Sequence, residues 1–203
     1  MLVIAGAFDP VQALGMVEQA FGPVPRPARV LDPTYTREAT RDGAREVTVN
    51  RVADSYWLAA LYLISAGAHP DTAALSALAE ILASSPAGRL HTELVERKKA
   101  SQSYAWMLDF AEPGCMVFWL ELDKNQSMAQ ARQAMLTQLE GVARKPITTT
   151  ELARAKAALL SEIDNTLNNA QSLAIALSEA IAKGDWRLFF LHRDRIEALT
   201  VAD

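Results

Sequence analysis

Two apolar stretches joined by a tight-turn sequence constrain the fold of this chain most strongly. Residues 101–110 and 115–123 are rich in aromatic and aliphatic side chains, and Glu112-Pro113-Gly114 lies between them. Two such runs separated by a short turn are typical of an antiparallel β-hairpin. Composition and periodicity predict three further strands, at residues 2–8, 47–52 and 55–65. The first and the third of these are expected to be buried, because they are almost continuously apolar.

Helices are predicted between and after the strands. Apolar residues recur at helical spacing, and the expected helices cover residues 10–21, 71–83, 88–97, 127–143, 148–168, 170–183 and 186–199. Asp9 and Asp71 are expected to cap their helices, and Thr148 with Glu151 fits the capping-box pattern. Strands meet in hairpins and helices are grouped. The sequence therefore predicts an α+β fold, an antiparallel sheet covered on one face by helices.

The predicted elements fall into three parts along the chain. Residues 23–46 contain four prolines, many charges and almost no periodicity, which is typical of a connector between folding units. We therefore expect residues 1–22 to be the closing strand and helix of a preceding repeat, residues 23–46 to be a linker, and residues 47–203 to be the main domain. Both ends of the sequence are abrupt, so the chain is expected to be a piece of a longer protein.

Charge and composition argue against several classes of protein. Twenty basic and 24 acidic residues give 20 − 24 = −4, and no basic stripe is interleaved with aromatic residues, so nucleic acid is not an expected partner. No apolar run reaches the roughly 18 residues of a membrane-spanning helix, so no membrane is expected either. The single cysteine, Cys115, cannot form an internal disulfide and is expected to be a buried thiol.

Catalytic and metal-binding patterns were sought around the three histidines. His91 is followed by Glu93 and Glu96, but helical metal pairs need ligands three or four residues apart, and Leu94 and Val95 occupy those positions. His69 is expected to lie in a solvated turn, and His192 to be a half-exposed packing residue. No nucleophile motif or phosphate-binding glycine loop is present. The residues therefore predict no catalytic residue, no metal ligand and no cofactor in this chain.

Four passages of the chain resemble, in order, the insulinase/pitrilysin family of zinc metallopeptidases. The passages are AGAFDPVQALGMVEQAFGPVPRP, YLISAGAHPDTAALSALAEILASSPAGRLHTELVERKKASQSYAW, ITTTELARAKAALLSEID and GDWRLFFLHRDRIEALTVAD. The resemblance as a whole extends over nearly all of residues 2–203. The resemblance implies an internal, non-catalytic domain of a bacterial two-repeat zinc protease. Arg89 and Leu90 match an Arg-Leu pair of the family, for which packing and helix capping are the implied roles.

The resemblance also implies partners for this domain. The family's zinc motif, H-x-x-E-H with a later glutamate, belongs to a preceding domain and is not in this sequence, so zinc is expected in the parent protein only. The family's substrate-holding Arg-x6-Tyr pair aligns with Val95 and Gln102, which are the wrong residue types. Arg97 and Tyr104 have the right spacing two positions away and are the candidate substrate-binding residues.

The function that follows is part of the wall of a peptidase chamber. The expected partners are the preceding zinc-bearing domain, the second half of the parent chain and a peptide substrate, and the fragment alone is expected to be inactive. The closing strand of this repeat would lie beyond residue 203, so residues 2–8 are expected to fill the vacant sheet position, within the chain or by swapping between chains, or to sit loose. An exposed sheet edge would favour a homodimer of the fragment. The compartment is open, with the periplasm favoured by the resemblance. The alternative is a structural or assembly subunit on the same fold with no peptidase activity in its parent.

Overall fold

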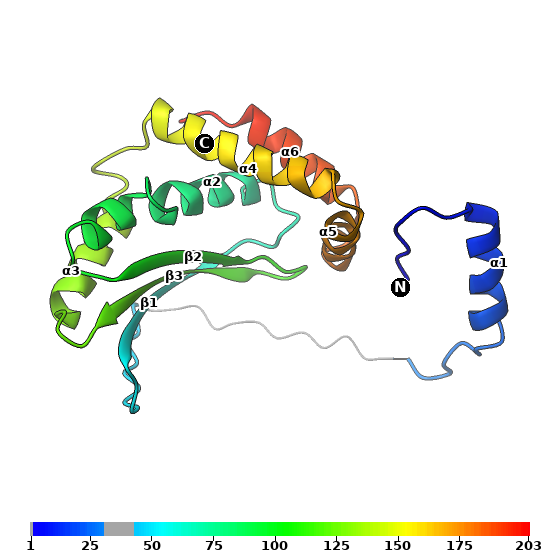
Figure 1. Cartoon of the computed structure of the whole chain (residues 1–203), viewed down its shortest axis with the longest axis horizontal. Coiled ribbons are helices and arrows are strands. Elements are labelled where there is room, and N and C mark those ends of the chain that lie inside the picture. Colours follow the sequence, from blue (N-terminus) through cyan, green and yellow to red (C-terminus); the bar gives the residue numbers. More distant parts are fainter. Residues whose placement is uncertain (1, 31–42) are drawn as a thin grey trace. The chain divides into compact units, whose positions relative to one another are not determined.

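The computed structural model describes residues 2–30 and 43–203 and divides them into two compact units (Figure 1). The larger unit is formed by residues 53–203, to which residues 2–5 are assigned, and the smaller one lies within residues 6–52. Part of the predicted linker, residues 31–42, lies outside the described residues. Of the described elements, only α1 (Pro10–Phe21) belongs to the smaller unit.

Helix α1 begins where the sequence predicts. The Oδ1 atom of Asp9 accepts hydrogen bonds from the main-chain N–H groups of Val11 (2.8 Å) and Gln12 (2.9 Å). Pro10 suits the first helical position because an N–H group there would have no helical partner. The predicted apolar face, which includes Val11, Leu14 and Phe21, is exposed, and α1 buries none of its side chains.

Three antiparallel strands form the sheet of the larger unit, in the spatial order β1-β3-β2. They are β1 (Ser55–Ile64), β2 (Gln102–Leu108) and β3 (Gly114–Asp123). The predicted hairpin is β2–β3, and its return requires a glycine, since a Cβ at Gly114 would lie 1.8 Å from the carbonyl oxygen of Leu108. In the central strand, Leu120 pairs with Leu58 on one side and Ser103 on the other.

Each strand of the sheet presents one face to the helices and one face away from them. The helix-covered face carries the core, including Ile64, Met116, Phe118, Leu120 and Leu122. The opposite face is also apolar but is not covered by any described element of the larger unit. Its side chains alternate with those of the core and come from all three strands: Trp57, Leu61 and Leu63, Tyr104 and Trp106, and the half-buried Val117 and Trp119. We call this set the open sheet face.

Helices form two further layers over the core face of the sheet (Figure 1). The inner layer contains α2 (Thr72–Ala83), a π-helical turn η1 (His91–Val95) and α3 (Met128–Leu139). The outer layer contains α4 (Thr149–Leu167) and α6 (Leu188–Ala198), with α5 (Ala170–Ala182) packed against both. A second small core, formed by Ala77, Ile81, Leu152 and Ala155, joins α2 to α4. The α+β fold predicted from the sequence, with a helix-covered antiparallel sheet, is confirmed.

Two predicted strands are absent from the described structure. Residues 2–8 and 47–52 are irregular and exposed, although their sequences favour extended backbone. A strand needs a neighbouring strand for its main-chain hydrogen bonds, and neither segment pairs with β1, β2 or β3. The predicted strand at 55–65 is confirmed as β1.

Burial differs from the prediction in two places, and one predicted cap is missing. Strand β1 is not buried on both sides, because its outward residues belong to the open sheet face. Cys115 lies on that same face and is half-buried. Asp71 precedes α2 as predicted but makes no capping hydrogen bond through its side chain. None of the described helices is long and apolar enough to cross a membrane.

Candidate functional site

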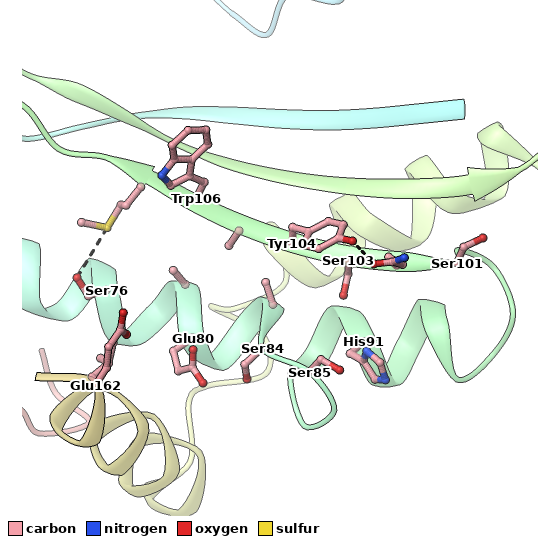
Figure 2. Close-up of a pocket in the computed structure, with 16 residues that line it drawn as sticks. Ser76, Glu80, Ser84, Ser85, His91, Ser101, Ser103, Tyr104, Trp106 and Glu162 are labelled. Atoms are coloured by element: carbon pink, nitrogen blue, oxygen red, sulfur yellow. Dashed lines mark hydrogen bonds between the residues drawn. The ribbon is translucent and has the colours of Figure 1, made fainter. Parts of the chain in front are cut away.

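A groove runs beside β2, between this strand and the helices (Figure 2). Its volume is about 580 Å³. One side is formed by residues 101–107, and the other by α2, the turn that follows it and α4. The groove exists because facing side chains are small: Ser103 and Ala105 on the strand, Ala79 and Ala83 on the helix. Large side chains at these positions would fill it.

Strand β2 lies at an edge of the sheet. It pairs with β3 on one side, and no other described strand pairs with it on the other. Main-chain N–H and C=O groups along such an edge are available to an additional extended chain. The groove therefore places unpaired main-chain donors and acceptors next to space that a peptide could occupy.

Ser103 has a hydroxyl group without a partner. The residue is only 7% exposed, and its Oγ atom makes no hydrogen bond. Its side chain points from β2 into the groove, towards Ser85 and His91 (Figure 2). A buried hydroxyl without a partner costs about 1–3 kcal/mol, which a ligand with a polar group could recover. Because Ser103 makes no hydrogen bond to His91, this pair is not arranged as a nucleophile with its base.

The groove carries negative charge. Glu80 of α2 and Glu162 of α4 both line it, and within residues 2–30 and 43–203 neither takes part in an ion pair. No lysine or arginine is among the lining residues; His91 is the only one that can become positively charged. The groove therefore has an acidic character.

The two candidate substrate-binding residues, Arg97 and Tyr104, lie in different surroundings. Arg97 follows η1 and forms an ion pair with Glu93, with 3.0 Å between its Nη1 and Oε2. Tyr104 lies on β2 and borders the groove, but its ring is on the open sheet face, where it packs against Trp119 with ring centroids 6.1 Å apart. Arg97 lines a different cavity, with Lys98 and Asn125. The structure thus places Tyr104, but not Arg97, at the groove, and their role in substrate binding stays a prediction.

The segment that holds His91, Glu93 and Glu96 is part of the scaffold. His91 faces the groove, while Glu93 is engaged by Arg97. Within residues 2–30 and 43–203, no three His, Cys, Asp or Glu side chains are grouped so that they could hold a metal ion.

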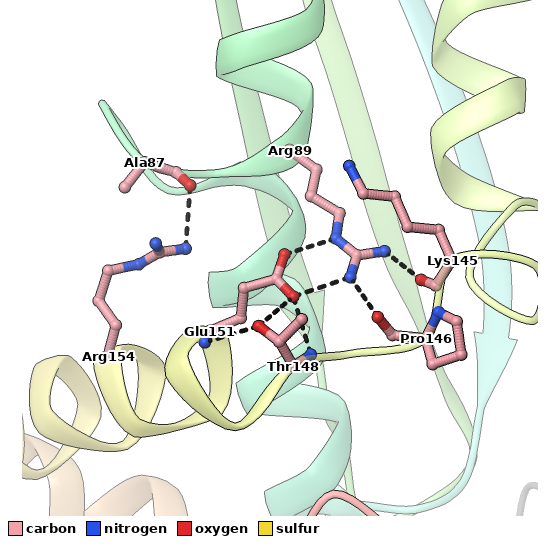
Figure 3. Close-up of polar contacts among 7 residues, drawn as sticks. All are labelled: Ala87, Arg89, Lys145, Pro146, Thr148, Glu151 and Arg154. Atoms are coloured by element: carbon pink, nitrogen blue, oxygen red, sulfur yellow. Dashed lines mark hydrogen bonds and ion pairs between the residues drawn. The ribbon is translucent and has the colours of Figure 1, made fainter.

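Arg89 anchors this segment to the start of α4 (Figure 3). Its Nε and Nη2 atoms donate to the two carboxylate oxygens of Glu151 at 2.7 and 2.9 Å. Nη1 and Nη2 also donate to the carbonyl oxygens of Lys145 (2.6 Å) and Pro146 (2.9 Å). Glu151 completes the predicted capping box with Thr148. Glu151 therefore caps α4 and holds Arg89 at the same time.

The Arg89–Glu151 ion pair should make the free energy of unfolding depend on pH in the acid range. The pKa of Glu151 is lowered from 4.5 to about 2, chiefly by the hydrogen bonds from Arg89 and then by those from the Thr148 N–H and hydroxyl, while burial acts in the opposite direction. A folded-state pKa below the unfolded value adds stability above about pH 4.5, and this is lost as the pH falls towards about 2. Urea unfolding at a series of pH values measures this loss. As the pH falls, the free energy of unfolding should decrease less steeply for Glu151→Gln than for the unchanged chain. An equally steep decrease in the two proteins would contradict the lowered pKa of Glu151.

Sequence reasoning missed the groove and its lining residues. Ser103, Glu80 and Glu162 are ordinary in the sequence, and only the packing of β2 against α2 brings them together. A signal was nevertheless present. Ala79 and Ala83 are four residues apart, and Ser103 and Ala105 alternate along the strand, so two stripes of small side chains could have indicated a gap.

These features define the class of the chain: an α+β domain with a helix-covered sheet face and a free strand edge beside a groove. Residues 1–159 match the family described as the peptidase M16 inactive domain, and the chain belongs to this family. This confirms the family resemblance noted in the sequence.

Individual relatives support the assignment. The zinc protease PqqE of Helicobacter pylori is 25% identical over 153 residues, which cover 74% of this chain and 34% of that protein. A candidate zinc protease of known structure from Bordetella pertussis Tohama I is 36% identical, covers 73% of this chain and 82% of that one, and gives a TM-score of 0.69. A protease structure from Helicobacter pylori, 22% identical, matches the fold with a TM-score of 0.90 over 98% of this chain and 48% of its own. This chain therefore spans about a third of the length of the zinc protease PqqE, the curated relative that it matches.

Proposed function

We propose that this chain is the non-catalytic domain of a zinc metalloendopeptidase and forms part of the wall of the chamber that holds the peptide substrate. The observation that carries this proposal is the free edge of β2 beside the groove. An extended peptide can add to such an edge as a further strand, with main-chain hydrogen bonds providing affinity and alternate side chains entering the groove. Family membership and the zinc protease relative support the peptidase context.

In this proposal, hydrolysis and the holding of the substrate belong to different domains. Zinc, held by a preceding domain, would supply an activated water for peptide hydrolysis. The present chain would hold an extended segment of the substrate through β2, Ser103 and the small side chains of the groove. It would thereby position the peptide while cutting nothing by itself. Tyr104 is retained as a substrate-binding residue in this proposal, since it lies on the strand to which the peptide would add and borders the groove, and Arg97 is not retained.

The proposal also includes the partners, the domain division and the location of the parent protein. Its preceding zinc-bearing domain and its second half would be the partners of this chain, and residues 1–22 would belong to the preceding repeat, with residues 23–46 as the linker. A periplasmic location rests on the family resemblance. The alternative, a structural or assembly subunit, would be favoured if the preceding domain lacked the H-x-x-E-H motif, which sequencing of the full reading frame decides.

Strand addition predicts that binding depends on the peptide's main chain. We expect the full chain to bind a fluorescein-labelled probe, Thr-Val-Thr-Gln-Thr-Val-Thr, measured by fluorescence polarisation. N-methylation of two alternate amides that face β2 should weaken binding about thirtyfold, because two main-chain hydrogen bonds of about 1 kcal/mol each are lost.

Two alternating N-methylation patterns provide the matched control. Only one of the two sets of amides faces β2 in an added strand, so the patterns should differ in affinity. Absence of binding by the unmodified probe, or equal loss with both patterns, would contradict strand addition at this edge.

A further inference from the structure

The charge of the groove indicates which peptides it should accept. We propose that the groove beside β2 selects extended peptides that present a lysine or arginine side chain to α2 and α4. This inference rests on the proposed function, because it specifies the substrate class of the same groove. It is carried by two observations that are independent of each other: the carboxylates of Glu80 and Glu162, and the unpartnered hydroxyl of Ser103.

The carboxylates lie on the helix side of the groove, opposite the strand edge (Figure 2). Glu80 is half-buried on α2 and Glu162 is exposed on α4. In the part of the chain that the structure describes, neither is neutralised by an ion pair, and no lysine or arginine lines the groove. An anionic side chain entering the groove would meet like charge, whereas a cationic one would meet opposite charge in a partly desolvated setting.

The hydroxyl of Ser103 shows that the groove is prepared for a polar ligand. It is nine-tenths buried, points into the groove and has no partner within the described structure. A peptide lying along β2 would pass this hydroxyl and could satisfy it through a main-chain or side-chain group.

The remaining lining suits the rest of a long basic side chain. Ala79, Ala83 and Leu159 line the same groove and provide apolar surface. The methylene groups of lysine or arginine can pack on such surface while the charged end reaches a carboxylate. A short anionic side chain gains neither contact.

The test uses three probes that differ only in the central residue: Thr-Val-Thr-X-Thr-Val-Thr with X as lysine, glutamine or glutamate. We expect the full chain to bind the lysine probe about tenfold more tightly than the glutamate probe, because attraction and repulsion each change affinity a few-fold. The difference should shrink as the salt concentration rises to about 1 M.

Two double variants separate the groove from the net charge of the protein. Glu80→Gln/Glu162→Gln should reduce the difference in affinity between the lysine and glutamate probes to about twofold or less. The control variant Glu18→Gln/Glu112→Gln removes the same charge at exposed positions that do not line the groove. It should show the same difference in affinity between the lysine and glutamate probes as the unchanged chain.

The outcomes distinguish this inference from the function beneath it. If all three probes bind with equal affinity, the groove binds peptides without charge selection, and this inference is wrong while the proposed function stands. If the preference persists in Glu80→Gln/Glu162→Gln, its source lies elsewhere and the inference is again wrong. If no probe binds, peptide binding at this edge is itself overturned.

Discussion

Replacing Arg89 with methionine should lower the free energy of unfolding by about 3 kcal/mol, because the change leaves a largely buried carboxylate without its partner. The Arg89 side chain is 5% exposed and donates four hydrogen bonds, two to Glu151 and two to carbonyl oxygens of residues 145 and 146. Methionine preserves most of the volume but none of these donors. Urea unfolding followed by circular dichroism measures the difference.

A second arginine in the same region provides the matched control. Arg154 donates one hydrogen bond from its Nη2 atom to the carbonyl oxygen of Ala87 at 2.9 Å, and this contact is exposed (Figure 3). Arg154→Met should therefore cost less than about 1 kcal/mol. The double variant Arg89→Met/Glu151→Met should be more stable than Arg89→Met alone, since no unpaired charge remains. Equal losses for Arg89→Met and Arg154→Met would refute the structural role assigned to Arg89.

Leu120→Ala should destabilise the chain by about 3–4 kcal/mol, because it opens a cavity in the centre of the main core. Leu120 lies in the middle strand and is 0% exposed. It packs on the helix-covered face together with Leu94, Phe118 and Leu122. The measurement is again urea unfolding, with the slope of the transition compared to detect changes in the unfolded state.

Leu61→Ala is the comparison for Leu120→Ala. Leu61 has the same side chain and also lies in the sheet, but it belongs to the open sheet face and is 47% exposed. Its truncation should cost less than about 1 kcal/mol, because little apolar area returns to water. If both leucine variants lose similar stability, then the open sheet face is covered in solution, and the assignment of one buried and one exposed face is wrong.

Local signals in the sequence predicted the elements that depend on local chemistry. The capping box of Thr148 and Glu151, the cap formed by Asp9 and the Pro113-Gly114 turn each involve residues within a few positions of one another. Such interactions can be inferred without knowing the tertiary structure. They were sufficient to identify the helices and the hairpin, and hence the fold class.

Features that depend on distant contacts could not be predicted in the same way. Arg89 and Glu151 are 62 residues apart, and nothing local indicates that they pair. Residues 2–8 have strand-like composition, but strand formation depends on a partner. Strand β1 is apolar on both faces, so its sequence does not reveal that one face lacks a covering layer. The acidic groove likewise results from the packing of β2, α2 and α4.

The open sheet face has an optical consequence. Three of the four tryptophans, Trp57, Trp106 and Trp119, lie on it, and the rings of Trp106 and Trp119 meet edge to face at 6.1 Å. Indole emission moves to shorter wavelength when water leaves its surroundings. The intrinsic fluorescence of this chain is therefore weighted towards a single surface, and it can report, without any attached dye, when another molecule covers the sheet.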